Sequence, residues 1–113
     1  MAPKSKQGGE VLADFIPKIK SKQVDELFDA ILSLKNREEC YRFFEDLCTV
    51  KEIQSFSQRL EVAKLLTLKK TYAEIENKTG ASTATISRVN RSLNYGADGY
   101  KIVLKRMGII DNK

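Results

Sequence analysis

Hydrophobic residues recur at helical spacing through most of the chain. After Ser21, an apolar stripe at offsets 0, 3, 4, 7 and 8 predicts a first amphipathic helix, and it consists of Val24, Leu27, Phe28, Ile31 and Leu32. A second stripe with the same offsets predicts a second helix, and it consists of Cys40, Phe43, Phe44, Leu47 and Cys48. This part of the chain is therefore predicted to be helical.

Capping signals mark the starts of the helices. A capping side chain followed three residues later by glutamate occurs at Asn36 with Glu39, Thr49 with Glu52, and Thr71 with Glu74. The helix after Thr49 is expected to run for about five turns and to end near Lys69 or Lys70. Its apolar stripe consists of Ile53, Phe56, Leu60, Ala63 and Leu66.

The rest of the chain predicts three further helices. Thr71 opens the segment TYAEIENKTG, which Gly80 closes in the left-handed conformation that costs glycine little. Ser82 then caps a helix within GASTATISRVNRSL, whose apolar positions are Ala84, Ile86, Val89 and Leu93. A turn at residues 94–96 precedes a last helix that starts at Asp98, runs through Ile102, Val103 and Met107, and stops at Gly108. Six helices without a convincing strand predict an all-α fold.

The length of the chain favours one domain. Its 113 residues, of which 42% are hydrophobic, suffice for one compact unit. Residues 1–20 are expected to form a poorly ordered N-terminal arm, because their first ten residues, MAPKSKQGGE, offer almost nothing to bury. Residues 21–108 are expected to form the helical domain, and residues 109–113 a C-terminal tail.

The two cysteines, Cys40 and Cys48, share the apolar face of the second helix and are interpreted as reduced core residues. Two cysteines cannot form a metal site alone, so no metal is expected. A reducing, cytoplasmic compartment fits this interpretation. The longest apolar runs are only a few residues, so neither a membrane span nor a membrane partner is expected.

Charge is unevenly distributed along the chain. The formal net charge of +5 is weak support for any particular partner. Between Asp25 and Glu52, however, acidic residues outnumber basic ones by four, whereas between Arg59 and Arg91 basic residues outnumber acidic ones by four. A surface that binds an anion is therefore expected in the second half.

That half contains the pattern of a helix-turn-helix at about residues 72–93. A short capped helix, a turn beginning with Gly80, and a helix with small polar residues at its start are what the motif requires. Contacts among Ile75, Ile86 and Val89 can fix the angle between the two helices. Small residues permit close approach to base edges in the major groove.

The predicted roles follow from position. We expect Thr83, Ala84 and Ser87 to face bases and Thr85 to lie near the backbone, while Arg91, Lys78 and also Lys69 and Lys70 neutralise phosphates. The full predicted DNA-binding set is Tyr72, Lys78, Ser82, Thr83, Ala84, Thr85, Ser87 and Arg91. Glu76 is an acid where the usual pattern prefers a small residue. The alternative is that Ser82 only caps the helix and the other hydroxyls are solvated.

The run from Leu47 to Leu93 resembles the core of the tryptophan repressor superfamily. The similarity is strongest to its YerC/YecD-type branch, in the stretches ECYRFFEDLCT, RLEVAKLL and TGASTATISRVNRSLNYG. It extends from about Ser21 to Gly108. This TrpR-like resemblance implies an intertwined, six-helix homodimer with a helix-turn-helix at each end. Independently, the first three predicted helices carry more apolar surface than a small monomer readily buries, because they include Phe28, Phe43, Phe44 and Phe56. Packing of these residues within one chain is the alternative.

The resemblance also implies an effector pocket, at Thr49, Arg59, Arg88 and Ser92. Where the family has glycine after the second arginine, this chain has Val89, whose branched side chain should occupy the space that an indole needs. Tryptophan is therefore not expected to bind, no cofactor is predicted, and any small-molecule effector is unidentified. We prefer the alternative that Arg59 and Arg88 brace the fold or contact phosphate.

The residues that are present favour a DNA-binding regulator, and the residues that are absent argue against an enzyme. Histidine is absent, and GASTATIS lacks the Gly-Lys-Ser/Thr ending of a phosphate-binding loop, so an enzyme is not expected. We expect a homodimeric, sequence-specific regulator of transcription, acting as a repressor on double-stranded DNA in a bacterial-type nucleoid. A helical protein-interaction module is the alternative, and RNA binding is disfavoured because Tyr72, Tyr95 and Tyr100 are scattered.

Overall fold

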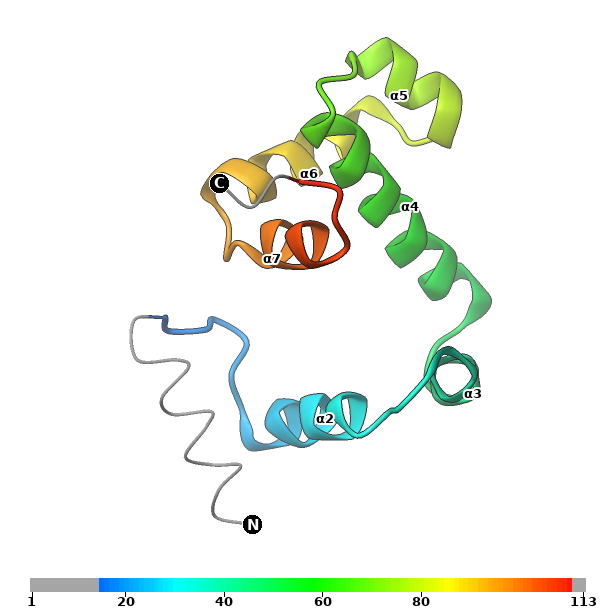
Figure 1. Cartoon of the computed structure of the whole chain (residues 1–113), viewed down its shortest axis with the longest axis vertical. Coiled ribbons are helices and arrows are strands. Elements are labelled where there is room, and N and C mark those ends of the chain that lie inside the picture. The colour runs from blue at the N-terminus through cyan, green and yellow to red at the C-terminus, as the bar shows by residue number, and fades with distance from the viewer. Residues whose placement is uncertain (1–14, 111–113) are drawn as a thin grey trace. The chain divides into compact units, whose positions relative to one another are not determined.

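The computed structural model describes residues 15–110, and every regular element in that range is a helix (Figure 1). The helices are α2 (Lys22–Leu32), α3 (Arg37–Leu47), α4 (Val50–Thr67), α5 (Tyr72–Thr79), α6 (Thr83–Tyr95) and α7 (Gly99–Arg106). The predicted all-α fold is therefore confirmed for the described residues. Residues 1–14 of the predicted N-terminal arm and residues 111–113 of the predicted tail lie outside them.

The described chain divides into two compact units between Cys40 and Tyr41, so the boundary falls within α3. In the first unit, Ser21 caps α2, since its Oγ accepts a hydrogen bond from the Val24 amide nitrogen at 3.1 Å. No residue of α2 is buried, and Phe28 and Leu32 of its apolar stripe are 45% and 79% exposed. The helix forms as predicted, but its apolar face is only partly covered in this chain, since Val24, Leu27 and Ile31 are half-buried.

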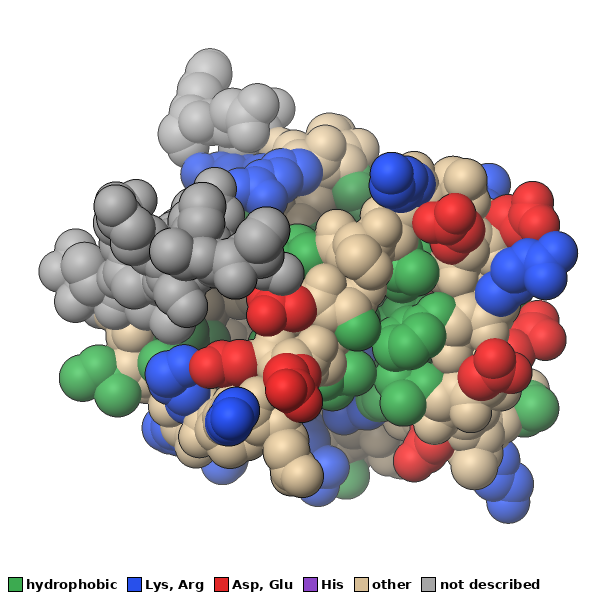
Figure 2. All heavy atoms as spheres, turned by 90° about the horizontal axis from the view of Figure 1, so that it is seen from below, with side chains coloured by type: hydrophobic (Ala, Val, Ile, Leu, Met, Phe, Trp, Pro, Cys, Tyr) green, Lys and Arg blue, Asp and Glu red, His purple; other side chains and the backbone are tan. Residues whose placement is uncertain are grey.

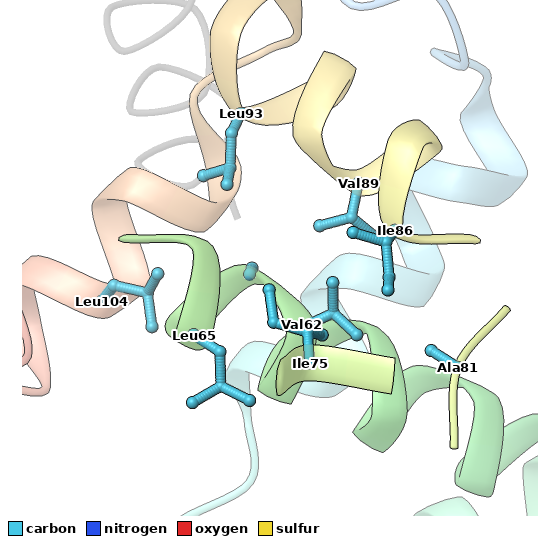
Figure 3. Packing of buried hydrophobic residues seen from close by; sticks show 9 residues of the cluster. Val62, Leu65, Ile75, Ala81, Ile86, Val89, Leu93 and Leu104 are labelled. Carbon is cyan, nitrogen blue, oxygen red and sulfur yellow. The ribbon is translucent and has the colours of Figure 1, made fainter. Parts of the chain in front are cut away.

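The hydrophobic core lies in the second unit, where α5, α6 and α7 pack against α4. Its buried residues are Val62, Ala63, Leu65, Ile75, Ala81, Ile86, Val89, Leu93 and Leu104. Figure 3 shows Ile86 and Val89 of α6 directed toward Val62 of α4. Full burial of one such aliphatic side chain is worth about 1.5–3 kcal/mol. The core therefore holds α6 firmly by one face.

The buried face of α4 differs from the predicted stripe. Only Ala63 of that stripe is buried, together with its neighbours Val62 and Leu65, while Phe56 is 47% exposed. The remaining predicted positions are half-buried, namely Ile53, Leu60 and Leu66. Positions 62, 63 and 65 span a wide arc of a helix with 3.6 residues per turn, so several helices cover this end of α4. Periodicity alone could not predict that crowding.

The C-terminal end of α4 comes earlier than predicted. The helix ends at Thr67, because Lys69 adopts a left-handed conformation with φ of 66°. The Lys69 amide donates to Leu66 O at 3.0 Å and the Lys70 amide donates to Leu65 O at 3.0 Å, which together form a Schellman motif. Non-glycine residues seldom adopt this conformation, so the stop is not evident from the sequence.

By contrast, α6 is longer than predicted. Residues Asn94 and Tyr95, which were assigned to a turn, are helical, and Gly96 follows the helix. A β-carbon at Gly96 would lie 2.5 Å from Ser92 O, so only glycine fits as the chain leaves the helix. The prediction of a turn was therefore wrong for its first two residues and correct for the glycine.

The last helix, α7, begins after Asp98 and stops before Gly108 as predicted. Asp98 has φ of 65°, and its side chain makes no capping hydrogen bond. The expected apolar positions are exposed, namely Ile102, Val103 and Met107 at 47%, 42% and 60%. Leu104 is fully buried instead, because it is the residue of α7 that contacts the core of the second unit.

The prediction that both cysteines lie in the core is wrong. Both are free, but Cys40 is exposed and Cys48 is half-buried. No residue of α3 is buried, and the Phe43 and Phe44 rings meet edge to face with their centroids 5.5 Å apart. One half of the predicted reciprocal cap of α3 is present, since the Glu39 amide donates to Asn36 Oδ1 at 2.9 Å. The Glu39 carboxylate accepts from the Lys35 amide at 2.8 Å and not from Asn36 as predicted. The prediction of a helix is thus confirmed, whereas the prediction that its cysteines are buried is wrong.

Hydrophobic side chains are exposed at the surface among acidic and basic ones (Figure 2). No helix in the described part of the chain is long and apolar enough to cross a membrane. Within residues 15–110, no group of three or more His, Cys, Asp or Glu side chains could hold a metal ion.

Candidate nucleic-acid interface

The first helix of the predicted helix-turn-helix, α5, is fixed at its start by a capping box. The Glu74 amide donates to Thr71 Oγ1 at 3.1 Å, and the Thr71 amide donates to Glu74 Oε1 at 2.8 Å. The hydrogen bond from the Thr71 backbone is the main reason that the pKa of Glu74 lies below its usual range, and the nearby Lys70 lowers it further. The same reciprocal cap occurs at Thr49 and Glu52 at the start of α4, as predicted.

The turn between α5 and α6 is held by short-range hydrogen bonds. Gly80 adopts the predicted left-handed conformation with φ of 74°, and its amide donates to Glu76 O at 2.9 Å. Thr79 Oγ1 donates to Ile75 O at 2.7 Å and accepts from the Ala81 amide at 3.1 Å. Every one of these bonds spans few residues, so the turn is specified locally.

Contacts with α4 fix the turn in space. Gln58 Nε2 of α4 donates to Thr79 O at 3.2 Å. Below the turn, Ile75, Ile86 and Val89 are at most 1% exposed, which confirms that these three residues join the two helices. The unit of α5, turn and α6 is therefore anchored through both backbone and side chains.

The exposed face of α6 carries the residues predicted to contact DNA. Thr83, Ser87 and Arg91 follow one another at four-residue spacing, and all three are exposed. Ala84 and Arg88 lie beside them and are exposed as well, while the opposite face enters the core. A row of small side chains bordered by two arginines therefore faces solvent.

Three of the predicted hydroxyl groups, those of Ser82, Thr83 and Thr85, already have protein partners. Ser82 Oγ caps α6 by accepting from the Thr85 amide at 3.1 Å, and it donates to Thr85 Oγ1 at 3.2 Å. Thr83 Oγ1 donates to Glu76 Oε2 of α5. The structure thus places Ser82 in a structural role beside the predicted contact surface, while Ser87 lies on the open face.

The remaining members of the predicted set differ in accessibility. Tyr72 is half-buried and packs against the core, and Thr85 is half-buried at the side of α6. Lys78 is exposed, as are Lys69 and Lys70. Lys70 and Lys78 line a shallow hollow with Leu65 and Glu74. Basic side chains therefore flank α5 as well as α6.

None of the four residues of the predicted effector pocket lines either of the two hollows described on this chain. Thr49 is the cap of α4, and its hydroxyl accepts from the Glu52 amide at 3.1 Å. The Arg59 guanidinium lies 5.4 Å from the Phe56 ring centroid, and its Nε donates to Ser55 O at 3.4 Å. The larger hollow along α4 is lined by other residues, namely Gln54, Ser57, Gln58, Leu60, Glu61, Lys78 and Thr79.

Arg88 and Ser92 from that set are exposed on α6, and Val89 between them is buried in the core. Arg88 therefore belongs to the same exposed surface as Arg91, one turn after Ala84, and this position is compatible with the phosphate contact that was one of its predicted alternatives. The contact between Glu76 and Thr83 was not predicted, because it joins two helices across a turn.

Three comparisons place this architecture among known proteins. A family model described as Trp repressor protein matches residues 22–108. The uncharacterized protein YerC of Bacillus subtilis (strain 168) is 62% identical over 92 residues, which are 81% of this chain and 88% of that protein.

Two solved structures are similar throughout their length. A candidate Trp repressor from Staphylococcus aureus is 63% identical, with a TM-score of 0.79 over 84% of this chain and 95% of its own. A TrpR-like protein from Eubacterium eligens ATCC 27750 is 61% identical, with a TM-score of 0.79 over 84% of this chain and 98% of its own.

Proposed function

The chain belongs to the Trp repressor protein family, and we propose that it binds double-stranded DNA through α5 and α6 as a homodimeric repressor of transcription. One observation carries this proposal. The exposed face of α6 combines small side chains with Arg88 and Arg91, while Ile86 and Val89 on its other face are buried. A helix held in this way can enter a major groove without unfolding or repacking.

The proposed contacts follow from chemistry and exposure. The methyl group of Ala84 suits a thymine methyl, and the Ser87 hydroxyl can donate to or accept from a base edge. Arg91 and Lys78 are placed to neutralise phosphates, which fix the position of the protein without reading sequence. Arg88 joins the proposed set because it is exposed between Ala84 and Arg91.

A second copy of the chain completes the proposal. The large apolar side chains exposed on α2, α3 and α4 include Phe28, Leu32, Leu47, Val50 and Phe56. Burying such side chains against a partner supplies the main driving force for association. Two recognition helices in one dimer would bind half-sites about 34 Å apart, a spacing carried over from dimeric helix-turn-helix proteins, of which the Trp repressor is itself an example.

The proposal includes no small-molecule effector. Thr49 and Arg59 have contacts within α4, and the Val89 side chain is part of the core. The contacts of Arg59 support the alternative that this residue braces the fold, whereas Arg88 is exposed and keeps the alternative of a phosphate contact.

Selection of bound duplexes from random-sequence DNA, together with the mass of the protein in solution, tests the proposal. A two-fold symmetric motif bound by a dimer is the expected result. Ser87→Glu places a negative charge on the exposed face of α6 and should remove the motif while leaving the helical content unchanged. Binding that is weak and without a motif would contradict the proposal and favour a protein-interaction module.

A further inference from the structure

One acidic residue lies among the proposed DNA contacts. Glu76 of α5 is exposed, and its carboxylate accepts a hydrogen bond from Thr83 Oγ1 at the first position of α6. A carboxylate at such a place repels the phosphates of any DNA that α6 approaches. The carboxylate therefore weakens binding to all sequences unless it accepts a hydrogen bond from a donor on a base.

The two side chains are held on a rigid frame. The backbone O of Glu76 accepts from the Gly80 amide at 2.9 Å, which closes the end of α5. The start of α6 is fixed by the Ser82 cap next to Thr83. Buried contacts of Ile75 and Ile86 hold both helices from beneath. The carboxylate and the hydroxyl are thus positioned before any ligand arrives, which reduces the entropic cost of binding.

This hydrogen bond decides what the pair can recognise. The hydroxyl group of Thr83 has one hydrogen, and it is donated to Glu76. The remaining lone pairs of the hydroxyl oxygen and of the carboxylate can only accept. In the major groove, guanine offers only acceptors, thymine offers an acceptor and a methyl group, and adenine offers an amino group beside an acceptor. Cytosine offers only its N4 amino donor.

The geometry points to Glu76 and Thr83 as a pair that selects cytosine at one position of each half-site. This inference rests on the proposed binding of α6 in the major groove. The pair accepts a hydrogen bond from the N4 amino group of cytosine. It disfavours guanine and thymine, because the acceptor atoms of these bases would face the carboxylate of Glu76 and the hydroxyl oxygen of Thr83, which can only accept. Adenine is disfavoured less, because only its N7 faces the carboxylate unfavourably. Glu76 acts on the base directly, and Thr83 both accepts and positions the carboxylate.

Two variants of the pair test this inference by selection from random duplexes at fixed salt. Glu76→Gln keeps the size of the side chain but adds donors, so the preference for cytosine at one position should fall by about 5- to 150-fold. Binding to unrelated DNA should strengthen several-fold at the same time, because a negative charge is removed. Thr83→Val keeps the shape without the hydroxyl and should also weaken the preference, whereas Thr83→Ser should retain it.

Asp98→Asn is the matched control, since it removes one exposed negative charge outside α5 and α6 at a residue whose left-handed backbone asparagine tolerates. It should leave the base preference at every position unchanged. A wild-type motif that lacks cytosine, or a Glu76→Gln motif identical to that of the wild type, would overturn the inference and leave the proposed function intact. Absence of any motif from the wild type would overturn both.

Discussion

The two ends of the described chain contain similar sequence patterns and reach different degrees of burial. α2 and α3 carry regular apolar stripes, yet neither has a buried residue. α5 and α6 have shorter apolar patterns, yet Ile75, Ile86 and Val89 are almost wholly removed from solvent. An amphipathic pattern therefore predicts that a helix has an apolar face. That face stabilises the chain only when another element packs against it.

This difference shows which region of the molecule forms a hydrophobic core within a single chain. The region from α4 to α7 buries nine hydrophobic residues within one chain. The apolar stripes of α2 and α3 are half-buried or exposed, and under the proposed function they become covered only in a homodimer. Variants in the two regions should consequently affect different properties.

Phe28→Asp should produce the largest effect, because it places a charge on the apolar face of α2 that the second copy is proposed to cover. Loss of the apolar contact and desolvation of the charge together should weaken dimerisation by about 3–6 kcal/mol, or at least about 100-fold. Sedimentation equilibrium measures this change. Gln23→Asp, an exposed position on the same helix, is the control. A dimer that survives Phe28→Asp unchanged would remove α2 from the interface.

Ile75→Ala tests the packed region. The side chain is fully buried between α5 and its neighbours, so truncation should lower the free energy of unfolding by about 2–5 kcal/mol. Chemical denaturation measures this loss. The control is Ile102→Ala in α7, where the side chain is 47% exposed and the cost should be much smaller. Equal effects at the two positions would contradict the assignment of the core.

Arg91→Ala separates DNA contact from packing inside the same region. The side chain is exposed, so folding stability should change by less than about 0.5 kcal/mol. Binding to DNA should weaken for all sequences, and the slope of log K against log salt should become shallower by about 0.9. Lys101→Ala removes the same charge from α7 and should leave the slope unaltered. An unchanged slope for Arg91→Ala would exclude a phosphate contact.

Lys69→Gly should stabilise the protein by about 1 kcal/mol, because glycine adopts the left-handed conformation found there without the cost of a β-carbon. Thermal melting measures the gain. Lys70→Gly should not stabilise, since Lys70 has no positive φ. If Lys69 also contacts phosphate as predicted, the stabilised variant will bind DNA less tightly. A variant with unchanged stability would show that the lysine conformation is free of strain.

The smallest effect concerns the cap of α5. Because the pKa of Glu74 is lowered in the folded chain, its contribution to stability is present above the pKa of the unfolded chain and is lost as the pH falls through the lowered value. The Glu74→Gln side chain is neutral at every pH, whereas Glu74 becomes neutral only in acid. The difference in melting temperature between the variant and the wild type should therefore shrink as the pH falls. Solvent screens this exposed group, and the change should be small. A constant difference would contradict the assigned cause.

Most of the local structure could be predicted from the sequence. The caps at Thr49, Thr71 and Ser82 and the left-handed Gly80 were all predicted, because each depends on groups within four residues along the chain. The candidate site was predicted to the extent that it is one exposed face of one helix, as with Ala84, Ser87 and Arg91. Arg88 lies on the same exposed face, and its predicted alternative of a phosphate contact stays a prediction.

Burial and contacts between elements needed the tertiary structure. The sequence determined where helices begin and which residues are apolar, since hydrogen bonding and periodicity act over one or two turns. Only the packing of α5, α6 and α7 around α4 decided that Val62 and Leu65 enter the core while Phe56 stays half exposed. The bond from Thr83 to Glu76 likewise depends on the angle between two helices, which is set by side chains that the turn brings together from α4, α5 and α6.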